Sequence, residues 1–120
     1  MPHDIRKSVW DAWNACRLIQ EFTTGQTLAS YLADDMRRSA VERQFEILGE
    51  AFNRIDDVDP SFRDRFSEMG NAIGMRNRIA HGYDQVIDAT VLDVAKERIP
   101  ILMAKLAAWL DENANGVGVS

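Results

Sequence analysis

Hydrophobic residues recur at steps of three and four along most of the chain, with polar residues between them. This period places them on one face of an α-helix, and no alternating run bounded by turn residues indicates a strand. The first such helix follows Asp4, a residue able to cap it, and ends at Thr23-Thr24-Gly25. Its apolar stripe is Ile5, Val9, Trp13, Cys16 and Ile19. The pattern therefore predicts an all-α protein.

Two more helices are expected before the middle of the chain. A short one runs from Leu28 to about Ala33, with Thr27 as its cap. A longer one ends at Asp56-Asp57-Val58-Asp59-Pro60, because proline cannot continue a helix. One face of the longer helix carries Val41, Phe45, Leu48, Phe52 and Ile55.

The second half begins with a weak helical turn from Phe62 to Phe66. Asp88 is a good cap for a last helix, which we expect to kink at Pro100. The inward face of this helix is predicted to carry Val91, Ala95, Leu102, Leu106 and Trp109.

The length of 120 residues suits one domain, which we place at residues 1–112, with residues 113–120 as a flexible tail of low apolar content. The hydrophobic fraction of 46% and charged fraction of 28% are typical of a soluble globular protein. No apolar run approaches the roughly 20 residues that cross a bilayer, and the N-terminus lacks a secretory pattern, so we expect a cytoplasmic protein with no membrane partner. The one cysteine, Cys16, lies on an apolar stripe and is predicted to be a small buried hydrophobe.

The net charge of -5 argues against a surface that attracts nucleic acid everywhere. The distribution of charge qualifies this conclusion, because eight of the fourteen basic residues, all arginine, lie between Arg37 and Arg78 against eight acids. Only this middle region could build a positive groove. The alternative is that most of these arginines pair with neighbouring acids on solvated helix faces.

Residues 76–83, RNRIAHGY, carry the most concentrated chemistry. If residues 71–83 are helical, Arg76 falls inside the apolar sector formed by Ala72, Met75, Ile79 and Tyr83. Burying a guanidinium costs several kcal/mol unless an anion or hydrogen-bond acceptors meet it, so the position requires a partner. That partner could be the carboxylate of Glu46 or Glu50, or a phosphate of a ligand.

His81 lies about 140° from Arg76 on an ideal helix, so the two side chains cannot share one small site while the helix stays regular. Either Gly82 ends the helix and turns Tyr83 away, or a second copy of the chain supplies the opposite residues. Asn77 stands one turn before His81, where its amide could hydrogen-bond the imidazole and select a tautomer.

These residues favour acid-base chemistry over metal catalysis, because the chain has no Cys or His pair at ligand spacing and no Gly-rich phosphate loop. An imidazole can move a proton near neutral pH, and an arginine can stabilise the charge of a phosphoryl transition state. RNA carries its own nucleophile in the 2'-hydroxyl, so cleavage needs only a base, an acid and a cation.

The order Arg76, Asn77, three further residues, His81, one residue and Tyr83 resembles the motif of the HEPN superfamily, and within it the HepT toxins paired with a MntA-type minimal nucleotidyltransferase. The similarity extends to the helix VERQFEILGEAFNRI and to ERIP in the last helix. One departure is that Ser67 to Asn71 stand where relatives often carry a Pro-Trp pair, which puts the geometry at the start of the motif helix in doubt.

The resemblance implies a homodimeric HEPN-type antiparallel bundle of four to five helices that cleaves RNA without metal or cofactor. Arg76 and His81 would be catalytic, with Asn77 in support. Tyr83 would accept AMP from the antitoxin, which uses ATP, and the added bulk and charge would block RNA. The protein would be the toxin of a type VII HepT/MntA toxin-antitoxin module.

Two other interpretations remain open at this stage. The first is a docking module that keeps the motif but binds a nucleotidyltransferase or nucleic acid without cleaving it, and the acidic net charge favours it slightly. The second is a structural helical bundle in which Arg76 pairs with Glu46 or Glu50.

Overall fold

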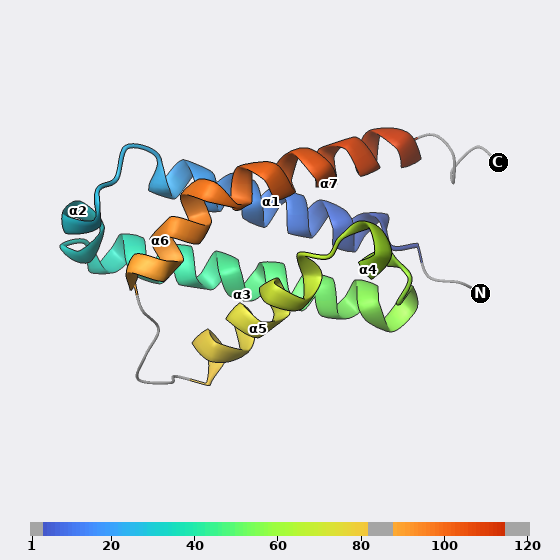
Figure 1. Ribbon diagram of the computed structural model, residues 1–120, viewed down its shortest axis with the longest axis horizontal. Coiled ribbons are helices and arrows are strands. Elements are labelled where there is room, and N and C mark those ends of the chain that lie inside the picture. Colours follow the sequence, from blue (N-terminus) through green and yellow to red (C-terminus); the bar gives the residue numbers. More distant parts are fainter. Residues whose placement is uncertain (1–3, 82–87, 115–120) are drawn as a thin grey trace.

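The computed structural model describes residues 4–81 and 88–114, and these residues form helices and no strand. The helices are α1 (Arg6–Thr23), α2 (Leu28–Leu32), α3 (Asp35–Val58), α4 (Phe62–Arg65), α5 (Met69–Ala80), α6 (Asp88–Glu97) and α7 (Ile99–Asn113). Figure 1 shows α1 and α3 running antiparallel, with α7 along α1 and α5 crossing beside α3. The predicted all-α class is confirmed. Five helices have ten or more residues, and α2 and α4 are short additions between them.

Polar side chains begin the first three helices. The carboxylate of Asp4 accepts a hydrogen bond from the N–H of Arg6 at 2.9 Å, at the start of α1. Thr27 and Ser30 form a reciprocal capping box at α2, as the predicted cap requires. Asp34 caps α3 by accepting from the N–H of Arg37 at 3.0 Å, a role that the sequence analysis did not assign.

The single kinked last helix that we predicted is instead two helices, α6 and α7, which meet at Arg98. Pro100 lies in the first turn of α7, where its missing N–H leaves no intrahelical hydrogen bond unmade, so it starts a helix rather than bending one. Asp88 is the first residue of α6 rather than a cap outside it. α7 continues to Asn113, one residue beyond the predicted domain boundary, and residues 115–120 of the predicted tail lie outside the described residues.

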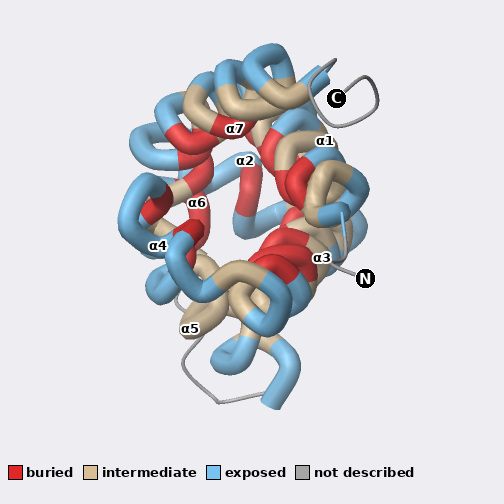
Figure 2. Tube along the Cα trace, turned by 90° about the vertical axis from the view of Figure 1, so that its right-hand side faces the viewer, coloured by how far each residue is buried: buried red, intermediate tan, exposed pale blue. Residues whose placement is uncertain are grey.

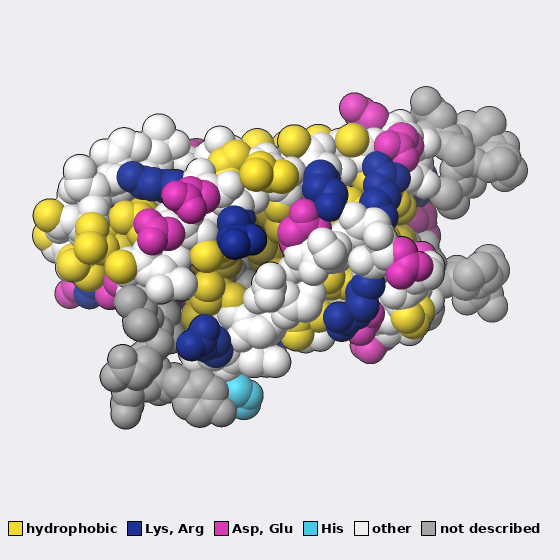
Figure 3. Space-filling model, viewed as in Figure 1, with side chains coloured by type: hydrophobic (Ala, Val, Ile, Leu, Met, Phe, Trp, Pro, Cys, Tyr) yellow, Lys and Arg dark blue, Asp and Glu magenta, His cyan; other side chains and the backbone are white. Residues whose placement is uncertain are grey.

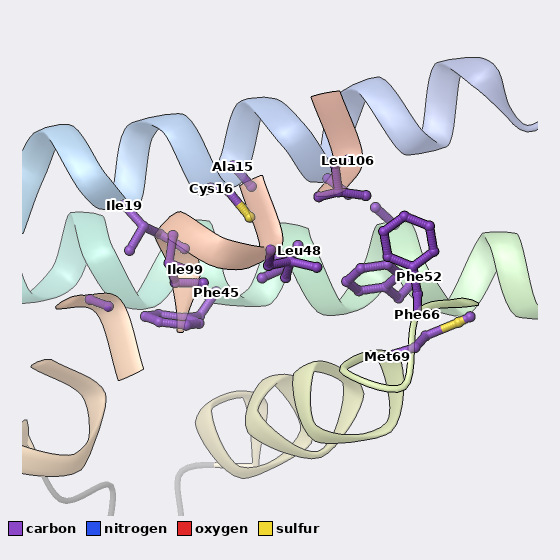
Figure 4. Packing of buried hydrophobic residues seen from close by; sticks show 14 of the residues in the cluster. Ala15, Cys16, Ile19, Phe45, Leu48, Phe52, Phe66, Met69, Ile99 and Leu106 are labelled. Atoms are coloured by element: carbon purple, nitrogen blue, oxygen red, sulfur yellow. The ribbon is translucent and has the colours of Figure 1, made fainter. Parts of the chain in front are cut away.

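Most of the buried residues lie on the facing sides of α1, α3 and α7, and α6 adds Val91, Leu92 and Ala95 (Figure 2). All five apolar positions predicted on the long third helix are buried, and Figure 4 shows Phe45, Leu48 and Phe52 directed toward the space between these helices. Cys16 is also buried, and this burial raises the pKa of its thiol to about 12. The thiol therefore stays protonated and acts as a small hydrophobe, as predicted.

α5 occupies a distinct place in this architecture, because its main contact is with α3 alone. Four of its residues, Ala72, Ile73, Met75 and Ile79, pack against the core while remaining partly exposed. α5 also lines a groove together with residues of α6 and α7. Within the described ranges, no helix combines the length and apolar character needed to cross a membrane.

Candidate functional site

The predicted site residues lie along α5 and at its C-terminal end. A regular helix over residues 71–83 and a helix that ends at Gly82 were both considered from the sequence, and α5 ends at Ala80, with His81 in the following turn at φ -87° and ψ 0°. The N–H of His81 still donates to the carbonyl of Asn77 at 3.1 Å, which closes the last helical turn. Gly82 and Tyr83, the predicted helix breaker and AMP acceptor, lie outside the described residues.

Arg76 sits where α5 approaches α3 most closely. Its stem lies on Gly49, where an added Cβ would come 2.2 Å from the Cβ of Arg76 and 3.0 Å from the carbonyl oxygen of Ala72. Only a glycine allows this approach, because the carbonyl oxygen of Ala72 is a backbone atom and the Cβ of Arg76 is bonded directly to the backbone. The side chain is half-buried, and its Nε is enclosed without a hydrogen-bond partner in the described part of the chain. The prediction of a guanidinium in apolar surroundings is thus confirmed.

The carboxylates suggested as partners of Arg76 are engaged elsewhere. Arg43 lies 4.0 Å from the carboxylate of Glu46 and 3.6 Å from that of Glu50. No carboxylate lies within ion-pair distance of Arg76 among residues 4–81 and 88–114. The structural-bundle interpretation, which required an Arg76 salt bridge to Glu46 or Glu50, is therefore wrong on this point.

Asn77 contacts Arg76 directly. Its side-chain oxygen accepts a hydrogen bond from the Arg76 guanidinium at 3.1 Å. The predicted contact of this amide with the His81 imidazole stays a prediction, and the observed bond adds a second role, because the amide oxygen holds the guanidinium. Asn77 is exposed, so this contact fixes the outer end of the arginine near solvent.

His81 is exposed at the end of α5. Because the helix is regular up to Ala80, the direction of His81 stays well apart from that of Arg76 around the helix axis. The fold therefore brings Arg76 and Asn77 together, and it places His81 on a different side of the same helix. Within a single chain, the described residues do not merge the cation and the imidazole into one small site.

Two residues of this region were not identified from the sequence. Gly49 determines how closely Arg76 approaches α3, and Arg43 keeps the α3 carboxylates occupied. The available signal for Gly49 was its position inside a long helix, where glycine is disfavoured by about 1 kcal/mol relative to alanine. No comparable signal marked Arg43, since an exposed arginine near acids is common.

Three or more His, Cys, Asp or Glu side chains do not gather in an arrangement suited to a metal ion anywhere in the described ranges.

The site thus consists of a partly buried arginine and an exposed histidine on one helix of an all-α bundle. The chain belongs to the ribonuclease HepT-like family, whose sequence profile matches residues 13–108. This match runs from the middle of α1 into α7 and includes the whole of α5, and it confirms the family inferred from the motif.

A curated relative supports the same assignment. The chain is 27% identical over 99 residues to a protein of Methanocaldococcus jannaschii that carries the name "Putative RNase". The alignment covers 81% of this chain and 88% of the relative. No solved structure matches the chain significantly.

Proposed function

We propose that the protein is a metal-independent endoribonuclease, the toxin of a type VII HepT/MntA toxin-antitoxin module acting in the cytoplasm. The observation that carries this proposal is the half-buried Arg76, whose Nε has no partner and which has no carboxylate nearby in the described part of the chain. A desolvated guanidinium in this state is energetically suited to receive a phosphate. Membership of a ribonuclease family and the name of the archaeal relative support RNA as the source of that phosphate.

In the proposed reaction, the 2'-hydroxyl oxygen attacks the adjacent phosphorus while the bond from phosphorus to the 5'-oxygen breaks. A base removes the proton of the 2'-hydroxyl, and an acid gives a proton to the departing 5'-oxygen. The products are a 2',3'-cyclic phosphate and a 5'-hydroxyl, and Arg76 stabilises the negative charge of the transition state. Asn77 supports the reaction by holding the guanidinium.

Two histidines are required if one acts as base and the other as acid. A homodimer would supply His81 and the partner subunit's His81, and it would also place an arginine of one chain opposite the histidine of the other. This arrangement resolves the divergence of Arg76 and His81 around α5. Light scattering should then give twice the mass of one chain for the active species.

The proposed antitoxin is a MntA-type nucleotidyltransferase that transfers AMP from ATP to the Tyr83 hydroxyl. Tyr83 lies two residues after His81, so a bulky anion there would compete with RNA phosphate for the same surface. Mass spectrometry after co-expression with the nucleotidyltransferase should show whole AMP units on Tyr83. AMP on another residue would contradict this role.

The decisive test is cleavage of cellular RNA by the purified protein in excess chelator, comparing wild type, His81→Ala and His3→Ala. Loss of a general base or acid typically slows a reaction about 10²- to 10⁴-fold, so His81→Ala should lose at least a hundredfold in rate. His3→Ala removes the only other histidine and should cleave like wild type. Cleavage that survives His81→Ala, or that needs a divalent ion, would refute the mechanism.

The second candidate function is a docking module that binds a nucleotidyltransferase or nucleic acid without cleaving it. The net charge of -5 favours this alternative. It would be supported if the wild-type protein formed a stable complex with the nucleotidyltransferase but left RNA intact under every condition tested.

A further inference from the structure

A groove separates α5 from α6 and α7, on the flank of α5 away from Arg76. Its volume is about 250 Å³, and it opens to solvent. The floor comes from α3 through Phe45 and Leu48, and the walls come from Met75 on α5 and from Val94, Ile99 and Leu102 on α6 and α7. Figure 3 shows yellow hydrophobic side chains in this hollow, with dark blue basic side chains on either side of it. The groove is therefore an apolar hollow with charged margins.

The charges at its margins are unusual for this chain. Four of the fourteen lysines and arginines, all within the described ranges, have no carboxylate at ion-pair distance: Arg76, Arg78, Lys96 and Arg98. Lys96 donates to the carbonyl of Gln26 instead. Arg98 lines the groove at the junction of α6 and α7. Arg78 does not line it but follows the lining residue Met75 by three positions on α5, on a neighbouring part of the helix surface. The uncompensated arginines thus collect around α5 and its groove.

The one acidic residue that lines the groove is neutralised. Both carboxylate oxygens of Glu68 accept hydrogen bonds from the Lys105 ammonium, at 3.0 and 2.9 Å. Arg78 and Arg98 are exposed and have no described carboxylate at ion-pair distance, so they add uncompensated positive charge beside the groove although the whole chain is acidic. Such a local field attracts a polyanion.

We propose that the groove binds one unstacked base of single-stranded RNA, with the flanking phosphates on Arg78 and Arg98. This inference rests on the proposed function for its choice of RNA and extends it to the substrate class. An apolar hollow between two cations matches the alternation of base and phosphate along a single strand. In a duplex the bases are stacked and paired, so they cannot enter the hollow.

The size of the groove agrees with a single base. Pockets for drug-sized ligands occupy roughly 300–1,000 Å³, and this groove is smaller. A second copy of the chain or a partner helix would bury a long apolar stripe and would gain nothing from two arginines without acids. A nucleic-acid strand uses both features at once.

The position of Arg78 connects the groove to the proposed reaction. Arg78 precedes His81 by three residues, so their side chains start roughly 5–6 Å apart on the helix surface. A strand whose base lies in the groove can pass Arg78 and continue to His81. The base held in the groove is then close to the bond that is cut, and the enzyme would cut unpaired regions in preference to duplexes.

The test measures RNA binding in the His81→Ala background, so that the RNA stays intact. Fluorescence anisotropy would compare a labelled 12-nucleotide single strand with a duplex of equal length. Arg78→Gln and Arg98→Gln should each weaken single-strand binding and reduce the slope of log K against log salt by about 0.7. Arg54→Gln is the matched control, because Arg54 is an exposed arginine that pairs with Asp11 at 3.3 Å and does not line the groove.

Filling the hollow separates base binding from phosphate binding. Val94→Phe should weaken single-strand binding on the order of tenfold, the effect of losing one stacked base, while leaving the salt slope unchanged. Val94→Leu is a milder filling variant if thermal unfolding shows that the phenylalanine disturbs the fold. Single-strand affinity should exceed duplex affinity for the parent protein, and this preference should disappear when the groove is filled.

Three results would overturn the inference. The first is equal affinity of the parent protein for duplex and single strand. The second is that the groove-filling variants bind RNA like the parent. The third is that these variants change the oligomeric state, which would assign the groove to a second copy of the chain. Cleavage by the wild-type protein is scored separately. If the wild-type protein cleaves RNA and the groove variants bind it normally, only this inference is refuted. If binding depends on the groove but the wild-type protein does not cleave, only the proposed nuclease activity is refuted.

Discussion

Gly49 and Arg76 meet where α3 and α5 come closest, and their contact determines the environment of the proposed catalytic cation. Glycine is a poor choice for the middle of a 24-residue helix, but a Cβ at this point would lie 2.2 Å from the Cβ of Arg76. The close approach encloses the Nε of Arg76, while Asn77 holds the outer end of the guanidinium. The hydrogen atom that Gly49 carries in place of a methyl group therefore determines how deeply the Arg76 guanidinium is buried.

Gly49→Ala should displace α5 from α3 and move Arg76. Overpacking typically costs about 1–3 kcal/mol, which exceeds the gain of about 1 kcal/mol from replacing a helical glycine, so we expect a net loss of stability and a fall in RNA cleavage. Gly74→Ala is the control, because a Cβ there meets open space and should stabilise α5. Urea unfolding and cleavage rates of the two variants check this prediction. Equal stability of both variants would contradict it.

At the scale of the elements, the local signals predicted most of the helices and located their starts better than their ends. Thr27 caps α2 and Asp4 lies at the start of α1 because capping depends on residues within one turn. The end of α5 at Ala80, with His81 as its C-cap, lies next to the predicted breaker Gly82, so a local signal was available there. The break at Arg98 was not predicted, because it depends on how α6 and α7 pack against other helices, which the local sequence does not specify.

Two carboxylates, Glu42 in α3 and Asp34 at its N-cap, should change the stability of the fold in opposite directions as pH rises. Burial is the main cause that raises the pKa of Glu42 above 4.5. The Asp88 carboxylate adds to this rise, and Arg38 opposes it. The folded protein then binds this proton more tightly than the unfolded chain, so ionised Glu42 lowers stability as pH rises past 4.5. Glu42→Gln should be more stable than wild type at pH 7, with the difference vanishing in acid. A constant difference from pH 3 to 7 would contradict this assignment.

Asp34 provides the contrasting case. The N–H of Arg37 lowers the pKa of the Asp34 carboxyl below 3.8, so the unfolded chain binds the proton more tightly. Its stabilisation is present above pH 3.8 and is lost as pH falls through the lowered value. Asp34→Asn should therefore be less stable than wild type at pH 7 and approach it at low pH. Urea unfolding at pH 3, 5 and 7 measures the stability of both variants relative to wild type. At pH 7, a Glu42→Gln variant less stable than wild type, or an Asp34→Asn variant more stable than wild type, would refute the assignments.

At the scale of the whole molecule, one core joins helices that are distant in sequence. Figure 4 shows Leu106 of α7 directed toward α1, with Phe52 of α3 and Phe66 nearby. The rings of Phe62 and Phe66 stack at 4.4 Å between centroids and cover one end of this core. This core fixes α1, α3 and α7, whereas α5 is attached mainly to α3. The helix that carries the site is thus attached to the bundle mainly through one other helix, and a groove opens beside it.

Leu106→Ala should destabilise the whole fold by about 2–5 kcal/mol, because Leu106 is fully buried and its removal leaves a cavity between helices. Ile101→Ala on the same helix is the control, since Ile101 is 61% exposed and its replacement should change stability by less than about 0.5 kcal/mol. Thermal and urea unfolding measure both effects. A small effect of Leu106→Ala would show that α7 is not part of the cooperative core.

The amino-acid sequence by itself determined the helical class, the core face of α3 and the candidate set Arg76, Asn77 and His81. These properties follow from periodicity and from the side chains within a few residues of each other. Only the tertiary structure decided that Arg43 takes the α3 carboxylates, that Gly49 admits Arg76, and that a groove with unpaired arginines opens beside α5. The physical reason is that burial, ion pairing and close approach depend on which helices meet, and residues far apart in the chain make those contacts.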